Sequence, residues 1–309
     1  MAATRTPELL IAGIAGAVLV YGAATTEGFL SPANFKAIFA GVGILGIVAV
    51  GMTFVTLSGS LFCLTLGTTL TVSSMGFLTW LQFGVVPAIL LTLLLGAVIG
   101  LGQGILVGGL GANPIIVTIG FGALQLGVAS KLTNSAAVYP PGDSNYAWLA
   151  STIAGLPVAV YVLVLLVLIS AFWLAKSTLG QTILLVGENQ SAARAAGLPV
   201  VKAITAAFVI AGGCAALGGV LLGATDGNAT LLSGGDRYTY DAIAAVLVGG
   251  VAASGGRGTV QQTVLGALLI AVISDMLLLR GASGGVQLLV TGAVVIVVLV
   301  FFQLRGHRS

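Results

Sequence analysis

Charged residues are scarce in this chain of 309 residues: 11 Lys and Arg and 8 Asp and Glu make up only 6% of it. With 58% hydrophobic residues and a mean hydropathy of +1.16, the sequence has too little polar surface to cover a soluble globule. It predicts an all-α polytopic membrane protein surrounded by lipid. The few cations are scattered, which excludes a nucleic-acid-binding patch.

Histidine and cysteine are also nearly absent. The single histidine, His307, lies in the C-terminal tail, and the acidic residues are dispersed, so we expect neither a catalytic triad nor a metal cluster. Cys63 and Cys214 lie far apart within apolar runs and are predicted to be buried, inert thiols. No Gly-x-x-x-x-Gly-Lys-Ser/Thr motif occurs, so the chain is not expected to be an enzyme with an ATP site or cofactor of its own.

Long apolar runs divide the chain into about ten expected membrane helices within a single domain, 1–309. They are 8–24, 36–57, 60–80, 83–108, 113–131, 157–175, 201–224, 240–253, 260–279 and 286–304. The eighth, 240–253, is short for a full crossing and is expected to be tilted or broken, with neighbouring helices shielding it.

A polar segment, Gly187–Pro199, interrupts this apolar pattern. Asn189 is a good N-cap, Glu188 lies where the helix dipole favours a negative charge, residues 190–196 have high helix propensity, and Gly197 is typical of a helix end. Two turns extend only about 10 Å, too little to cross a bilayer. The segment therefore predicts a short helix outside the lipid on which a partner docks.

The pattern Gly-x-Asn-x-x-Ala-Ala-x-x-x-Gly-Leu at 187–198 resembles the cytoplasmic coupling helix of ABC importer permeases, in the branch that carries ribose and related sugars. Tyr240–Ala245 and Ser254–Thr259 look like two further signatures of that family, in the expected order. The resemblance implies that a separate ATPase docks on residues 188–197. The residues implied in coupling are Glu188, Asn189, Ala192, Ala193, Arg194 and Gly197.

In that comparison Ala192, Ala193 and Gly197 would give close packing to the ATPase. Arg194 is either an ion-pair partner of the ATPase or an ordinary solvated charge.

The same resemblance implies the partners. They are an ABC ATPase that binds ATP and Mg²⁺, an extracytoplasmic solute-binding protein, and a second copy of the permease or a sister permease. The expected function is translocation of a sugar or sugar-like solute. A branched-chain amino-acid or nucleoside permease is an alternative, as is an ion-coupled secondary transporter with Asp275 as its ion site.

The distribution of cations supports one orientation. Placing the coupling segment in the cytoplasm and alternating sides leaves seven cations inside and four outside, in agreement with the positive-inside rule. Both termini are then cytoplasmic, and the family resemblance implies that the chain lies in a bacterial inner membrane.

A few polar residues on apolar segments are candidates for the solute pathway. Asp275 is costly in lipid, and it either lines the pathway or bonds a neighbouring helix. Asp241 either caps the eighth segment or acts in gating, whereas Thr53 and Thr118 bond the backbone or line the path. The sugar-permease relatives usually show an Asp at the position of Phe62, which indicates a divergent solute site or a subunit paired with a more typical sister.

Overall fold

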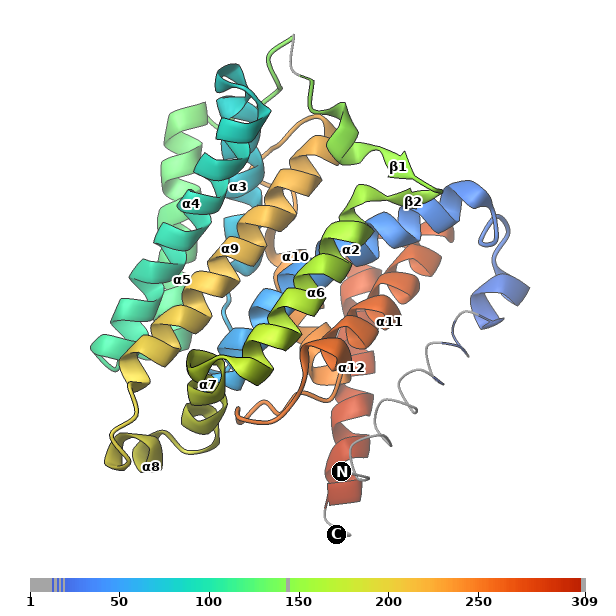
Figure 1. Ribbon diagram of the computed structural model, residues 1–309. Helices are drawn as coiled ribbons and strands as arrows, with labels where there is room; N and C mark the ends of the chain where they lie inside the picture. Colours follow the sequence, from blue (N-terminus) through green and yellow to red (C-terminus); the bar gives the residue numbers. More distant parts are fainter. Residues whose placement is uncertain (1–12, 14–15, 17, 19, 143–144, 307–309) are drawn as a thin grey trace.

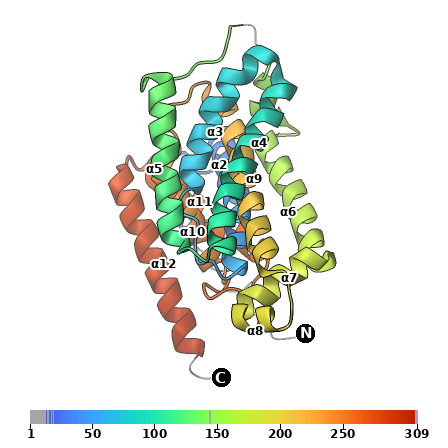
Figure 2. The same cartoon turned by 90° about the vertical axis from the view of Figure 1, so that its left-hand side faces the viewer.

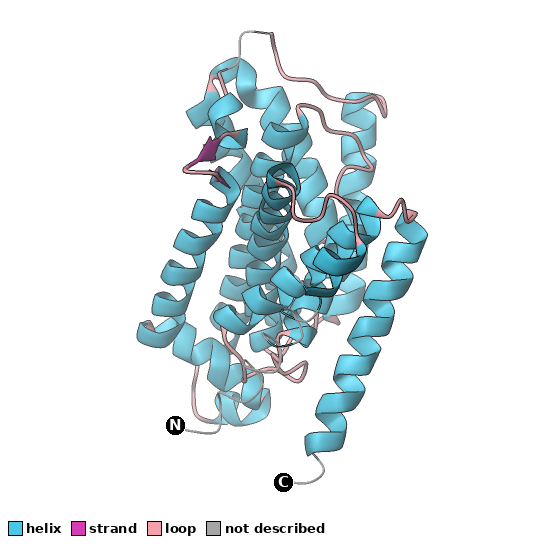
Figure 3. Ribbon diagram, turned by 90° about the vertical axis from the view of Figure 1, so that its right-hand side faces the viewer, coloured by secondary structure: helices cyan, strands magenta, loops and turns pink. Residues whose placement is uncertain are grey.

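The computed structural model describes the whole chain except residues 1–12, 14–15, 17, 19, 143–144 and 307–309, and it is a helical bundle (Figure 1). The long helices are α2 (Pro32–Leu57), α4 (Val85–Gly104), α5 (Pro114–Thr133), α6 (Val158–Lys176), α9 (Val200–Asp226), α11 (Val260–Leu279) and α12 (Gly284–Gly306). The shorter elements are α3 (Leu66–Trp80), η1 (Leu81–Phe83), the π-helical turn η2 (Ile105–Gly109), η3 (Ala147–Ala150), α7 (Thr178–Glu188), α8 (Gln190–Ala195) and α10 (Gly235–Val248). Two-residue strands β1 (Thr152–Ile153) and β2 (Leu156–Pro157) form a small antiparallel hairpin at one end (Figure 3).

Within the described residues, six helices are long and apolar enough to cross a membrane: α2, α4 with η2, α5, α6, α9 and α11. Each coincides closely with one of the expected segments, which confirms an all-α polytopic membrane protein. Helix α12 falls on the last expected segment. The first expected segment, 8–24, lies largely outside the described residues.

Local capping explains where several helices begin. The side chain of Asn113 accepts a hydrogen bond from the Ile115 N–H at 2.9 Å, and Pro114 takes the first helical position of α5. A capping box starts α11, because the Thr259 side chain bonds the Gln262 backbone and the Gln262 side chain bonds the Thr259 backbone. These helix starts are therefore encoded by adjacent residues.

Helix α9 is the centre of the bundle and packs against α2, α3 and α4 (Figure 1). It crosses α4 closely and in the opposite direction, because Gly96 of α4 meets Gly212 and Gly104 meets Thr205. An added Cβ on Gly96 or Gly212 would overlap the carbonyl oxygen of the other. Small residues at four-residue spacing allow such contact between backbones in lipid.

Helices α3 and α10 are too short for a full membrane crossing, since 14 or 15 residues extend about 22 Å, roughly three-quarters of a bilayer core of about 30 Å. Helix α3 starts beside the middle of α9, with Leu70 against Gly218, and runs away from the α8 end of the bundle. Helix α10 runs the opposite way and brings Gly249 against Gln262, at the start of α11.

The segments expected at 60–80 and 240–253 are therefore corrected. Residues 58–65 are not helical, and several of their backbone N–H groups find partners inside the protein: Gly59 donates to the Thr56 carbonyl at 3.0 Å, and Cys63 to Met52 Sδ at 3.4 Å. Gln103 Nε2 also donates to the Thr65 side chain, to Oγ1 at 2.9 Å. Non-helical backbone at membrane depth requires such partners. Helix α10 begins at Gly235, within what looks like a loop, and ends at Val248.

The beginnings of α3 and α10 meet and cap each other. The Gly67 N–H donates to Thr239 Oγ1 at 2.9 Å, and the Gly235 N–H donates to Thr71 Oγ1 at 2.9 Å. Thr71 also donates to the Ser233 carbonyl. The N-terminus of each short helix is therefore capped by a threonine of the other helix. These hydrogen bonds replace those that water would make to a helix end at the membrane surface.

Candidate functional sites

Helix α8 lies at one end of the bundle, between α7 and α9 (Figure 1). The Asn189 side chain caps it as expected, accepting from the Ala192 N–H at 3.0 Å and from the Ser191 hydroxyl at 2.7 Å. Gly197 ends the turn with a φ of +74°, a conformation that glycine adopts without strain.

The outer face of α8 is formed by small and polar residues. Ala192 and Arg194 are exposed, as are Asn189 and Gly197. Ala193 is only 4% exposed and belongs to the hydrophobic core, so it cannot supply packing to a partner. This corrects the expectation for Ala193, because its side chain packs into the bundle and does not lie on the outer face of α8.

Glu188 ends α7 and pairs with Arg257, whose Nε lies 3.5 Å from Glu188 Oε1. Both side chains are substantially exposed, so solvent weakens the pair. A groove of about 660 Å³ lies beside α8 and is lined by the residues after α2, the start of α5 and the α7–α8 junction. The α8 end of the bundle therefore presents a hollowed, polar surface.

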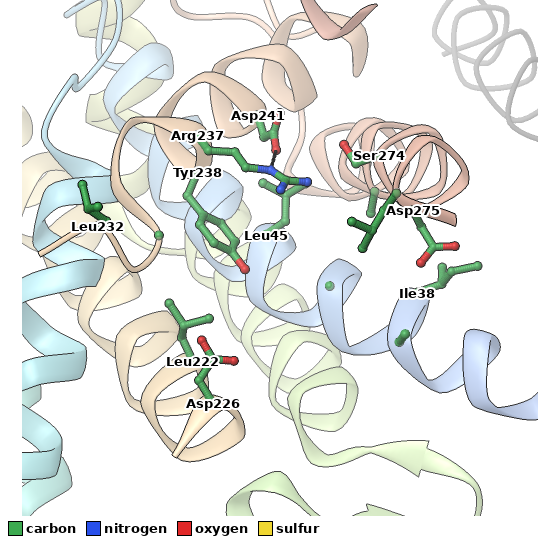
Figure 4. A pocket seen from close by; sticks show the side chains of 15 residues that line it. Ile38, Leu45, Leu222, Asp226, Leu232, Arg237, Tyr238, Asp241, Ser274 and Asp275 are labelled. Atoms are coloured by element: carbon green, nitrogen blue, oxygen red, sulfur yellow. Dashed lines mark ion pairs between the residues drawn. The ribbon is translucent and has the colours of Figure 1, made fainter. Parts of the chain in front are cut away.

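A second cavity, of about 460 Å³, lies at the other end of the bundle (Figure 4). It is enclosed by the first half of α2, the last turns of α9 and α11, and the start of α10. Its polar and charged lining residues are Asp226, Arg237, Tyr238, Asp241, Ser274 and Asp275. Carboxylates, a guanidinium and hydroxyl groups facing one space can hydrogen-bond a polar, uncharged solute on several sides.

Asp241 contributes to this cavity from the second turn of α10. It does not cap the helix, as one expectation had it, because α10 already begins at Gly235. Asp241 is 6% exposed and pairs with Arg237 one turn earlier, Nε to Oδ2 3.6 Å (Figure 4). The guanidinium thus compensates a buried carboxylate while both remain on the cavity wall.

Asp275 makes the bond to a neighbouring helix that was one of the two roles considered for it, and its part in a solute pathway stays a prediction. It lines the cavity, and its Oδ2 accepts a hydrogen bond from Asn34 Nδ2 at 2.9 Å. Asn34 is 7% exposed and also donates to the Phe29 carbonyl at 3.1 Å. Asp275 therefore joins α11 to the start of α2 at the edge of the cavity.

Two substitutions of Asp275 distinguish what its charge and its hydrogen bond to Asn34 each contribute to the stability of the protein. Asp275→Asn keeps an oxygen acceptor for Asn34 and is expected to change the free energy of unfolding by a few tenths of a kcal/mol. Asp275→Leu removes the acceptor and is expected to destabilise the protein by about 1 kcal/mol. Thermal unfolding in detergent measures both, and an equal loss in the two variants would show that the charge, not the bond, stabilises this position.

Thr53 and Thr118 do not line this cavity. Thr53 Oγ1 lies 2.6 Å from Thr263 Oγ1 and donates to the Ala49 carbonyl at 2.8 Å, which joins α2 to α11. Thr118 is buried on α5 and donates to the Ile115 carbonyl at 3.2 Å. Both therefore make the structural contacts that were the alternative to a pathway role.

Sequence reasoning missed other residues of the cavity. Asp226 ends α9, and Arg237 and Tyr238 come from a segment that looked like a surface loop. The adjacent charged and aromatic pair just before the predicted eighth helix was the available signal. Asn34 gave no signal, since its partner lies 241 positions away.

The structure defines a polytopic helical membrane protein with two short helices that begin inside the bundle, an exposed short helix at one end and a polar cavity at the other. Residues 37–299 match the model of the family described as "Branched-chain amino acid transport system / permease component". The chain belongs to this family of ABC transporter permeases, which are not themselves enzymes.

Named relatives fall in the same group. The chain is 31% identical over 261 residues to the D-allose transport system permease protein AlsC of Escherichia coli, covering 84% of this chain and 79% of the relative. It is 33% identical over 241 residues to the autoinducer 2 import system permease protein LsrD of Yersinia enterocolitica, covering 74% and 71%. The probable ABC transporter permease protein YphD of E. coli is 35% identical over 168 residues, covering 53% and 49%. No solved structure matches the chain.

Proposed function

We propose that this chain is the membrane-spanning subunit of an ATP-driven importer for a sugar or sugar-like solute in the bacterial inner membrane. The observation that carries the proposal is the exposed, Asn189-capped helix α8 on a chain of the permease family. The relatives named for D-allose and autoinducer 2 import support a sugar-like solute. The hydrogen-bonding groups around the cavity at the other end suit the same class of solute.

The proposed arrangement has ten crossings and both termini in the cytoplasm. Two of these crossings, 58–80 and 227–248, consist of a loop followed by a short helix. The α8 end then faces the cytoplasm, and the cavity opens toward the outside. A single domain, 1–309, contains the whole path through this subunit.

Energy and solute come from partners in this proposal. A separate ATPase binds ATP and Mg²⁺ and docks on the outer face of α8, with Ala192, Gly197 and Arg194 as contacts. A solute-binding protein delivers the solute to the outer end, and a second copy or a sister permease completes the assembly within the lipid. ATP-driven closure of the ATPase pair shifts the balance between inward-open and outward-open states.

The proposal is tested by pull-down of the tagged chain expressed with its neighbouring genes. Ala192→Glu places a carboxylate on the exposed first turn of α8, where the helix dipole favours negative charge, so the helix itself stays intact. We expect the wild type to recover an ATPase and Ala192→Glu to recover at least tenfold less, as measured by mass spectrometry.

Ala136→Glu is the matched control, since Ala136 is also exposed but lies in the loop after α5, at the other end of the bundle. It should recover as much ATPase as the wild type. Equal recovery with Ala192→Glu would contradict docking on α8, and absence of an ATPase from the wild type would contradict the importer.

A further inference from the structure

Three segments that are far apart in the sequence meet at the α8 end: the end of α2, the end of α7 and the loop that follows α10. The Gly256 N–H donates to the Leu57 carbonyl at 3.0 Å. A Cβ on Gly255 would lie 2.7 Å from the Gly59 Cα and 2.9 Å from the Gly187 oxygen. The backbones of these segments are therefore in direct contact, with no side chain between them that could yield.

Gly59 and Gly255 have φ values of +78° and +92°, and Gly256 has +73°. Two features disfavour a side chain at these glycines. The left-handed backbone strains any residue that has a Cβ, and the space is filled, because a Cβ on Gly256 would lie 2.6 Å from the Glu188 nitrogen. Movement of the end of α7 toward the loop 254–258 would therefore push directly on its backbone. The exposed Arg257–Glu188 pair lies across the same contact but adds little energy.

The loop 254–258 leads directly back to α10, whose other end lies at the cavity. Tyr238 and Asp241 line the cavity from α10, and Thr239 accepts the Gly67 N–H. Helix α10 therefore connects two regions. Its C-terminal end contacts the α7–α8 segment through the loop that follows it, and its N-terminal end contacts α3 and lines the cavity. Figure 2 shows α10 inside the bundle and α7 and α8 at its lower end.

We propose that Gly59, Gly187, Gly255 and Gly256 form a joint that passes movement of the α7–α8 segment to α10, and through α10 to the outer cavity. The inference rests on the proposed function of α8 as the ATPase docking site. It assigns a positioning role to four glycines, since close contact between backbones transmits displacement that flexible side chains would absorb.

The test follows α10 directly and requires no knowledge of the solute. Spin labels are placed at Leu232→Cys, just before α10, and Leu132→Cys, at the end of α5; the two side chains are 91% and 78% exposed. Pulsed electron resonance on the permease–ATPase complex compares the label distance without nucleotide and with ATP, Mg²⁺ and vanadate. We expect a shift with the wild-type joint and a shift at least threefold smaller with Gly256→Ala, with the same recovery of ATPase.

Gly281→Ala is the matched control. Gly281 has a φ of +71°, so alanine brings the same backbone strain, but an added Cβ meets nothing within 4 Å. It should retain the full shift. A full shift in Gly256→Ala as well would overturn the joint while leaving ATPase docking in place.

A second variant decides the question if Gly256→Ala does not fold. Gly59→Ala brings similar backbone strain, at a φ of +78°, but its added Cβ lies 3.2 Å from the Gly187 Cα, so the overlap is milder than at Gly256. It should reduce the nucleotide-dependent shift while recovering the same amount of ATPase. A full shift in Gly59→Ala would overturn the joint, and a wild-type chain that recovers no ATPase would overturn the proposed function and the joint together.

Discussion

Gly212→Leu is expected to abolish recovery of folded permease. A Cβ at Gly212 overlaps the Gly96 carbonyl oxygen and lies 3.2 Å from the Gly100 nitrogen. Overpacking costs about 1 to 3 kcal/mol where side chains can shift, and occasionally more. Here the opposing atoms are backbone, so no rotamer relieves the overlap and α4 must move away from α9. Gel filtration in mild detergent should show no monodisperse peak.

The neighbouring residue gives a control on the same helix. An added Cβ at Gly213 meets nothing within 4 Å, so Gly213→Leu makes the same change in hydrophobicity and helix propensity without the overlap. It should be recovered like the wild type, with thermal unfolding at a similar temperature. Equal behaviour of the two variants would contradict the close α4–α9 crossing.

Local signals predicted most helices well. Asn113 with Pro114 and Thr259 with Gln262 determine helix starts through contacts within three residues, so the sequence around them is sufficient. The same holds for α8, whose cap at Asn189 and end at Gly197 follow from adjacent residues. The family signatures near these elements indicated the class of protein before the structure was considered.

The non-helical residues 58–65 and the start of α10 at Gly235 could not be predicted in this way, although 240–253 was expected to be tilted or broken because it is short. Residues 61–64 are as apolar as a membrane helix, so hydropathy shows no interruption there. The loop holds its shape through Gln103, on another helix, 38 residues from Thr65. Likewise Gly234 and Gly235 look like a loop, and α10 starts there because Thr71, 164 residues away, accepts the Gly235 N–H.

In the candidate sites, too, features determined by adjacent residues were predicted and features that depend on packing between distant segments were not. Helix α8 was identified as a unit, but which alanine turns inward depends on how the turn packs against the bundle, and Ala193 was assigned to the wrong face. Asp241 and Asp275 were named as candidates, and the structure brings them to one cavity. Thr53 and Thr118 were named for the pathway with a structural role as the alternative; neither lines this cavity, and both make hydrogen bonds within the bundle.

Gly67→Ala is expected to release the contact between α3 and α10. An added Cβ overlaps the Gly235 carbonyl oxygen and lies 2.6 Å from Thr239 Oγ1, so the two helix starts must separate. Both reciprocal caps are then lost, at about 0.5 to 2 kcal/mol each on the scale of helix caps. Because a loss of 1.4 kcal/mol is a tenfold change in a local opening equilibrium, amide hydrogen exchange should accelerate at least tenfold in 66–71 and 235–241.

Two comparisons make this result specific to the reciprocal caps. Gly76→Ala, also on α3, brings a Cβ only against the Trp80 ring, 3.1 Å away, and should leave exchange in 235–241 unchanged. Thr71→Val and Thr239→Val each remove one cap, and acceleration by either variant should appear in both helices, since each bond joins the two. Acceleration confined to α3 in all these variants would show that α10 holds its position without α3, and that the two short helices are independent of each other.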